Sequence, residues 1–255
     1  MKQMKKTVMF VLATCLLTAC SSDNDNTQST PLYDNVVVDE QYTTTQENGL
    51  TICRDESGRV TTIDVLQTWQ DDYNFLETLK KAPTSFEDIS YLFPLSEGNE
   101  IRLTSTSENP ALKDYPDYPQ YFEYYSQYYK DVPVVGYAKR IHYFLMPEGK
   151  RMSYAIFGPV IDVRNLDTKP GITEKQARQV MADYLKVKRD DSWPCQLQIK
   201  EYSTRKDGKI QRDVRLIYSI EGPLAPTDPN VYYYMAPQYH AAIDAHTGQL
   251  ITISS

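Results

Sequence analysis

Three histidines and one aspartate are the side chains whose types and spacing come closest to a metal site. The histidines are His142, His240 and His246, and Asp244 lies between the last two. On a strand, His240 and Asp244 would share a face, while His246 falls in the following turn, and no fourth ligand is evident. Zinc sites need three or four convergent ligands. We therefore expect structural or surface roles for these residues, with no metal and no cofactor.

Hydrolytic chemistry has no recognisable motif in the chain. The zinc-protease pattern H-E-x-x-H is absent, and so is a glycine-rich phosphate loop. A Cys/His nucleophile would need Cys53 or Cys195 to meet a histidine in the folded chain, and no local signature supports this. The adjacent acids Asp71-Asp72 and Asp190-Asp191 are typical of solvated surface. We expect no catalytic residues and a protein that is not an enzyme.

The N-terminus has the pattern of a bacterial lipoprotein leader. Lys2, Lys5 and Lys6 precede a short apolar run, Val8 to Leu17, and the segment L-T-A-C ends at Cys20. The apolar run is too short for a finished membrane span. Residues 1–19 are therefore predicted to be a cleaved signal peptide, with Cys20 lipidated; an ordinary signal peptide or a buried helix is the alternative. The lipid would anchor the protein to the outer membrane, at its periplasmic face or on the cell surface.

The residues after Cys20 are polar and acidic. Residues 21–30 contain nothing to bury, so we expect residues 20–45 to form a flexible tether. Asp23 and Asp25 resemble the acidic surface-export signal of Bacteroidetes lipoproteins, although Asn24 interrupts it; a plain spacer is the alternative. The whole chain has 27 Lys and Arg against 34 Asp and Glu, a net charge of −7. A nucleic-acid partner is disfavoured, because phosphate contacts need a basic surface.

Two cysteines remain once the leader is set aside. Cys15 leaves with residues 1–19 and Cys20 is lipidated, so Cys53 and Cys195 are left in a compartment that permits disulfides. They can form one bridge between the two halves of the chain. They can equally be separate buried thiols.

The pattern of apolar residues in 46–165 predicts strands, a helix and a tyrosine-rich strand. Strands at 50–54 and 60–63 flank a turn at 55–58, and a helix should follow from Val65 to Leu79. A short helix or a loop is expected at 85–95, and a short strand at 101–103. From Tyr121 the tyrosines are dense, which fits a strand with one face in the core. Stacking of sugars on Tyr124 and Tyr128 is the alternative reading.

Residues 166–255 predict a helix followed by an antiparallel sheet. Thr173 is a good N-cap, and Gln176 stands three residues later to close a capping box. The apolar period then changes from helical to two, and the turn at 206–209 joins two alternating strands. A further strand enters the sequence I-D-A-H-T-G-Q, residues 243–249, and a last short strand follows.

These elements resemble two known families. The helix, hairpin and D-A-x-T-G turn, with Asp244, Thr247 and Gly248, resemble the PepSY domain. Gly248 should have positive φ, which lets the chain reverse. Residues 127–136 resemble the fungalysin–thermolysin propeptide, although Asp131 replaces its usual glycine; Asp tolerates left-handed geometry. The resemblance implies an α+β fold of two successive helix-plus-antiparallel-sheet units, residues 46–165 and 166–255.

The resemblance also implies a mode of action. Such propeptides cover a protease cleft, so the expected function is a free-standing protease inhibitor or chaperone in the cell envelope, binding a secreted protease or an envelope receptor. An exposed sheet edge at 231–242 would supply the contact. The alternatives are a PepSY-like regulator of an envelope sensor kinase and a tyrosine-rich glycan-binding lipoprotein. The expected partner-binding residues are Tyr124, Tyr128, Tyr232, Tyr234 and His240.

Overall fold

The computed structural model describes residues 41–48, 50–64, 82–111, 117–145, 149, 151–225 and 238–254. These residues are mostly strand, with one α-helix and one 3-10 helix. The elements are β1 (Thr43–Glu47), β2 (Leu50–Arg54), β3 (Val60–Asp64), η2 (Glu87–Leu92), β4 (Asn99–Asn109), β5 (Gln120–Tyr129), β6 (Val132–Leu145), β7 (Arg151–Phe157), α2 (Glu174–Leu185), β8 (Cys195–Lys206), β9 (Lys209–Leu224), β10 (Gln238–Asp244) and β11 (Leu250–Ser254).

The expected α+β fold of two helix-plus-sheet units is therefore wrong, because strands dominate the molecule. The first sheet is accompanied, among the described residues, only by the short helix η2. The helix predicted from Val65 to Leu79 lies outside the described residues. The strand expected at 101–103 is confirmed, but it is longer than expected: it is part of β4, which is 11 residues long and largely exposed. The Thr/Ser run after Leu103 has no apolar alternation, so no pattern in the sequence indicates that the strand continues there.

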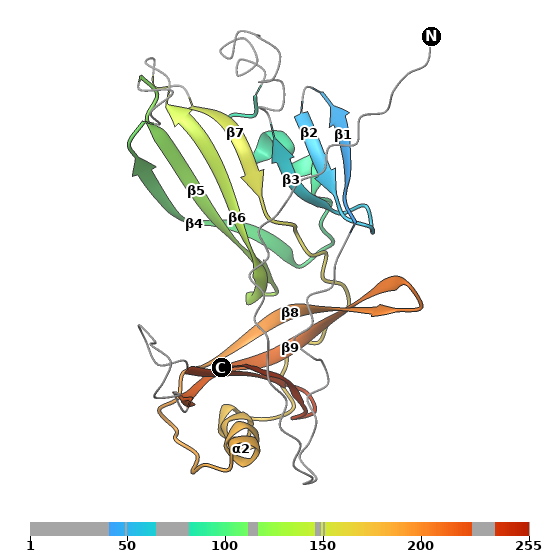
Figure 1. Ribbon diagram of the computed structural model, residues 1–255, viewed down its shortest axis with the longest axis vertical. Coiled ribbons are helices and arrows are strands. Elements are labelled where there is room, and N and C mark those ends of the chain that lie inside the picture. The colour runs from blue at the N-terminus through green and yellow to red at the C-terminus, as the bar shows by residue number, and fades with distance from the viewer. Residues whose placement is uncertain are drawn as a thin grey trace, which may run out of the picture.

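The first sheet is antiparallel and contains β1 to β7. Its order runs β1-β2-β3-β7-β6-β5-β4, so β1 and β4 are its outer strands (Figure 1). The predicted hairpin of β2 and β3 and the predicted tyrosine-rich strand β5 are both confirmed. Lys130 and Asp131 link β5 to β6 with φ of 47° and 65°. Two left-handed residues in succession form the type I′ turn that two-residue hairpins prefer, which is the geometry expected of Asp131.

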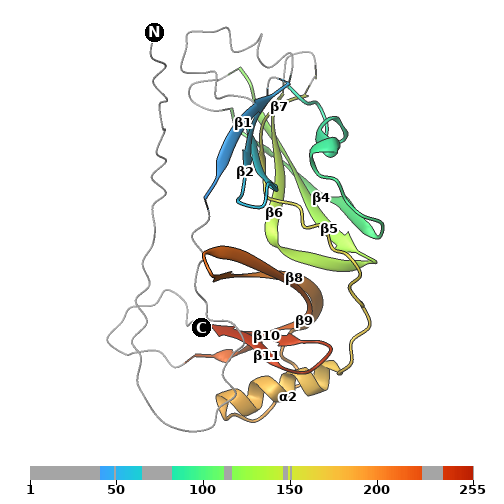
Figure 2. The same cartoon turned by 90° about the vertical axis from the view of Figure 1, so that its right-hand side faces the viewer.

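The second sheet is the antiparallel set β8-β9-β10-β11, with α2 on one face (Figure 2). The helix predicted from Thr173 is confirmed, with both halves of the capping box: the Gln176 N–H donates to Thr173 Oγ1, and the Thr173 N–H donates to Gln176 Oε1. Ala177 and Met181 on its inner face are fully buried against the sheet. Asp207 and Gly208, both with positive φ, make the predicted turn between β8 and β9.

Strand β6 joins the two sheets. Residues 140–145 of β6 pair with β7, while Val134 and Val135 pair in parallel with Ile199 and Lys200 of β8. Gly136, at φ +120°, lies between these two parts, where the register with β5 also shifts. A left-handed conformation of this kind is strained for any residue with a side chain. The glycine therefore allows β6 to change partner from one sheet to the other.

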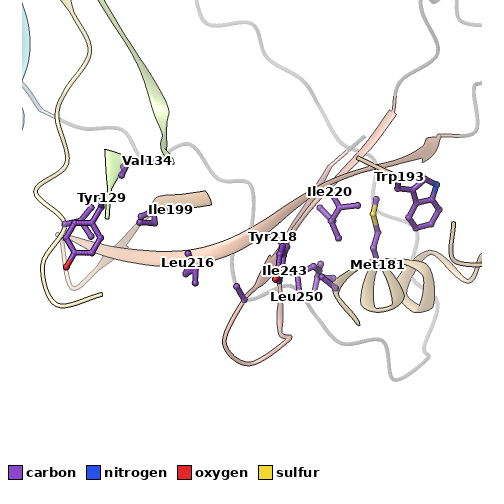
Figure 3. Packing of buried hydrophobic residues seen from close by; sticks show 14 of the residues in the cluster. Tyr129, Val134, Met181, Trp193, Ile199, Leu216, Tyr218, Ile220, Ile243 and Leu250 are labelled. Carbon is purple, nitrogen blue, oxygen red and sulfur yellow. The ribbon is translucent and has the colours of Figure 1, made fainter. Parts of the chain in front are cut away.

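The tip of the β5–β6 hairpin is part of the second core. Figure 3 shows Tyr129 and Val134 beside Ile199, with Leu216 further along β9 and Met181 of α2 near the other end. All five side chains are at most 6% exposed. The first sheet keeps a core of its own, but its hairpin tip packs into the core of the second sheet, although the sequence suggested a boundary between residues 165 and 166.

Two side-chain amides fix the linker between the sheets, residues 158–173, which joins β7 to α2. Gln127 accepts the Ile161 N–H at 3.1 Å and donates to the Ile161 carbonyl. Asn99 accepts the Val163 N–H at 3.1 Å and donates to the Val163 carbonyl at 2.8 Å. Each amide satisfies a backbone donor and acceptor as a neighbouring strand would. The linker is therefore hydrogen-bonded across the foot of β4 and β5.

An ion cluster joins the β2–β3 turn to the β8–β9 hairpin. The Asp55 carboxylate accepts from Arg59 Nε at 3.0 Å and from Arg212 at 2.9 Å. Arg59 also donates to Glu201 at 2.9 Å, and Arg212 Nε lies 3.3 Å from the same carboxylate. The side chains of Asp55 and Glu201 are 0% and 4% exposed. The cluster, which we call the junction cluster, balances two buried carboxylates with two guanidiniums.

Candidate functional site

The D-A-x-T-G turn is built by its aspartate. Asp244 Oδ1 accepts the backbone N–H groups of His246 and Thr247 at 3.0 and 2.9 Å, and Arg215 donates to Oδ2 at 2.8 Å. Gly248 has φ +78°, so the predicted positive φ is confirmed. Burial alone would raise the pKa of Asp244, but the hydrogen bonds from Thr247 and Arg215 outweigh it and lower the pKa. These contacts give the turn a structural role.

The same turn docks on the segment that precedes α2. The N–H groups of Gly171 and Ile172 both donate to the Ala245 carbonyl, at 2.9 and 3.1 Å. His246 Nε2 lies 3.1 Å from the Asp167 carbonyl oxygen. A Cβ at Gly171 would lie 2.5 Å from the His246 carbonyl oxygen, so only glycine fits this approach. The turn therefore positions the segment that leads into the helix.

The histidines do not converge. Within the described part of the chain, no three His, Cys, Asp or Glu side chains are grouped as a metal site would require. His142 instead packs edge-on against Phe122, with ring centroids 4.3 Å apart. Burial, helped by the charge of Arg140, lowers the pKa of His142 to about 4. The imidazole is thus neutral at physiological pH.

Cys53 and Cys195 are not bridged. Cys53 lies on β2 of the first sheet, Cys195 begins β8 of the second, and both are half-buried free thiols. Burial raises the pKa of the Cys195 thiol to about 11. A thiol with so high a pKa is a poor nucleophile at neutral pH, because the thiolate is the reactive form. Cys20 lies outside the described residues.

The edge expected at 231–242 is not an edge where the structure describes it. Strand β10 begins at Gln238, and from His240 to Ile243 it is paired on both sides, with β9 and with β11. His240 on this strand is exposed, but its backbone lies inside the sheet. Tyr232 and Tyr234 lie outside the described residues. Adding a strand at His240–Ile243 is therefore ruled out, because these residues already pair with a strand on each side.

Tyr124 and Tyr128 lie on β5, half-buried, and an arginine covers part of each ring. The guanidinium carbon of Arg102 is 4.3 Å from the Tyr128 ring centroid, and that of Arg140 is 5.9 Å from the Tyr124 centroid. Cation–π contacts of this kind occupy one ring face. A sugar would have to displace the arginine or use the other face, which weakens the glycan-stacking alternative.

Strand β4 is the open edge that sequence reasoning missed. Among the described residues β4 pairs only with β5, and Leu103 on it is 52% exposed. A long unpaired edge offers a row of backbone donors and acceptors to another strand. The Thr/Ser-rich sequence without proline is the signal that indicates such an edge, because β-formers that are polar on both faces suit an outer strand.

The pairing pattern shows which β4 groups point outward. Tyr129 and Val132 flank the two-residue turn, and their backbone N–H and C=O groups bond to each other. Along a strand these groups point to alternate sides, so those of the preceding residue, Tyr128, point toward β4, where Tyr128 is paired with Glu100. The Lys130 N–H, which donates to the Gly98 carbonyl at 2.8 Å, follows the same alternation. The backbone N–H and C=O groups of Ile101 and Leu103 therefore point away from β5, toward the open side of β4.

A bulge divides this edge in two. The register shifts between Leu103 and Ser105, so one residue of β4 has no counterpart on β5. Beyond it Ser105 faces Tyr124 and bonds inward, which leaves the backbone groups of Thr106 and Glu108 pointing outward. The edge thus presents two short runs of outward backbone groups, Ile101–Leu103 and Thr106–Glu108.

Comparison with known proteins adds no relative. No protein-family model matches the chain, and a search of curated proteins finds no similar sequence. No helix in the described part of the chain is long and apolar enough to cross a membrane. The functional argument therefore rests on the residues and their geometry.

Proposed function

We propose that this protein binds an extended segment of a protein partner along β4, as a non-catalytic lipoprotein of the cell envelope anchored through Cys20. The observation that carries the proposal is the open, exposed β4 edge, which ends a seven-strand antiparallel sheet. In strand addition, backbone hydrogen bonds supply affinity, and side chains that alternate along the strand supply selectivity.

The partner we propose first is a secreted protease that the protein inhibits or helps to fold. A strand that lies along an enzyme cleft forms hydrogen bonds with the backbone groups of the cleft, much as an extended substrate does. An exposed edge strand can inhibit a protease in this way. Restraint of an envelope sensor kinase uses the same edge and remains the alternative. The inhibitor and chaperone readings predict that binding changes the partner's peptidase activity or its refolding yield.

The test removes one outward donor. Thr106→Pro deletes an N–H that points away from β5, and proline is tolerated on an edge strand. Thr106→Ala removes the same side chain but keeps the N–H, so it is the matched control. A photo-crosslinking residue placed at Glu108 of the full-length lipoprotein, in the cells that produce it, reports the partner.

We expect the crosslinked adduct in the unmodified and Thr106→Ala proteins and its loss or marked reduction with Thr106→Pro. Losing one net hydrogen bond costs about 0.5–1.5 kcal/mol, and the proline ring adds a steric clash with the incoming strand. Equal crosslinking of all three proteins would show that β4 is not the contact.

A further inference from the structure

A cavity lies where the first sheet meets the linker that leads to α2. Its volume is about 300 Å³, and it is bounded by the β2–β3 turn, the end of η2 and the linker before α2. This is the lower end of the range for small-molecule sites. Its size suits one ring with a short substituent.

The floor of the cavity is apolar. Val60, Leu92, Phe93 and Val160 line it and are otherwise buried in the first hydrophobic core. Each is at most 8% exposed, so these side chains are held rigidly by packing. A preformed apolar wall of this kind favours an aromatic or branched aliphatic group over a polar one.

The polar side of the cavity is basic. Arg54, Arg59 and Arg164 line it, against the single carboxylate of Asp162. Arg59 is committed to Asp55 and Glu201 in the junction cluster. The two guanidiniums that can serve a ligand are therefore Arg54 and Arg164. Such a basic cluster stands out in a chain whose net charge is −7.

Among the described residues, each of these arginines pairs with one carboxylate that solvent reaches in part. The side chains of Arg54 and its partner Glu47 are 25% and 41% exposed, and those of Arg164 and its partner Asp162 are 71% and 23% exposed. Each pair has one member that is more than a third exposed, so solvent screens its attraction. Each guanidinium carries five N–H donors, and the contacts with Glu47, Asp162 and the Gly58 carbonyl leave some of them available.

We infer that this cavity binds a small organic carboxylate with one apolar ring or branched chain. The carboxylate lies between Arg54 and Arg164, where bidentate charge-assisted hydrogen bonds form. The apolar group lies against Leu92, Phe93 and Val160. A neutral amide of the same shape cannot take the place of the acid, because it brings an N–H₂ donor where guanidiniums already donate.

The test measures the binding of phenylacetate and of its isostere phenylacetamide to the full chain by ligand-observed NMR. Arg164→Gln and Arg54→Gln remove the proposed partners one at a time. Arg189→Gln is the matched control, since it breaks a similar exposed pair with Asp191 away from the cavity. Unchanged thermal midpoints of the variants establish that each is folded.

We expect phenylacetate to bind with the weak affinity of a fragment, and phenylacetamide to show no saturable binding. Each cavity variant should weaken phenylacetate binding by about ten-fold or more, whereas Arg189→Gln leaves it unchanged. Binding should also weaken at high salt, because the site is partly open to solvent.

Three results would overturn the inference. They are no phenylacetate binding at millimolar concentration, equal binding of the amide, and equal weakening by Arg189→Gln. None of these results bears on β4, so the inference fails or stands independently of the proposed function.

Discussion

Asp55 is the residue whose replacement should reveal how the two sheets are held together. Its side chain is 0% exposed and accepts hydrogen bonds from Ser57, Arg59 and Arg212. Asp55→Asn keeps the shape but removes the charge, and it presents an N–H₂ group to arginines that only donate. Two guanidiniums would then share the single carboxylate of Glu201.

The cost should be large because the charges left behind are buried. Arg59 and Arg212 are only 17% and 15% exposed, so water screens them poorly. Removing one partner from a buried ion pair costs ~3–5 kcal/mol. We expect about 3 kcal/mol here, since both arginines keep Glu201. For a chain of this size, that corresponds to a fall in Tm of ~6–12 °C.

The assay is denaturant unfolding, with Asp191→Asn as the matched control. Asp191 is 62% exposed and pairs with Arg189 on the surface, so its replacement should change the free energy of unfolding by less than ~0.5 kcal/mol. If Asp55→Asn costs no more than Asp191→Asn, the junction cluster does not hold the two sheets together.

The dependence on pH gives a second readout of the same cluster. Burial would raise the pKa of Asp55, but the Ser57 hydrogen bond and the charges of Arg59 and Arg212 together lower it. A carboxyl whose pKa is lowered by folding adds stability above its unfolded pKa, near 3.9, and loses it as pH falls through the folded pKa. Asp55→Asn should therefore flatten the acid limb of the stability curve, and an unchanged limb would contradict this.

The remaining predictions concern three separate positions. Burial, and then the charge of Arg59, lowers the pKa of Lys139 to about 8. Since the folded protein loses this proton at a lower pH than the unfolded chain, the free energy of unfolding should rise by ~2–3 kcal/mol as pH increases from about 8 to 10.4. Unfolding measured as a function of pH should lose this rise in Lys139→Met. A Cβ at Gly248 meets Ile172 only at 3.7 Å, so Gly248→Val should cost at least ~1 kcal/mol through backbone strain alone, and an unshifted denaturation midpoint would refute this. Cys20→Ala should move the protein from the membrane to the soluble fraction, and continued sedimentation with membranes after a high-salt wash would count against lipidation.

Features that depend on neighbouring residues could be predicted from the sequence. The start of α2 follows from Thr173 and Gln176, which form the capping box within one turn. The β8–β9 turn follows from Asp207 and Gly208, and the reversal at Gly248 from the absence of a side chain. In each case the residues that decide the conformation are within a few positions of one another, so pattern and propensity suffice.

Features that depend on distant residues could not be predicted. Arg59 meets Glu201 across 142 positions, and Arg212 meets Asp55 across 157. The pairing of Val134 with Ile199 is equally non-local. The fold class was wrong for a related reason: β1 and the part of β4 after Leu103 are polar on both faces, so neither has the apolar alternation by which strands are recognised. The β4 edge was therefore overlooked, and an edge was assigned to β10 instead.

The junction determines how the β4 edge can work. Movement of one sheet against the other would break the junction cluster, the amide contacts of Asn99 and Gln127, and the packing of Tyr129 on the second core. Asn99 and Gln127 lie on β4 and β5 themselves, so the linker is bonded to the same strands that form the edge. A partner strand therefore meets a surface that is already ordered, and binding does not require the two sheets to rearrange. Destabilising the junction cluster should then weaken binding along β4 only as far as it unfolds the protein.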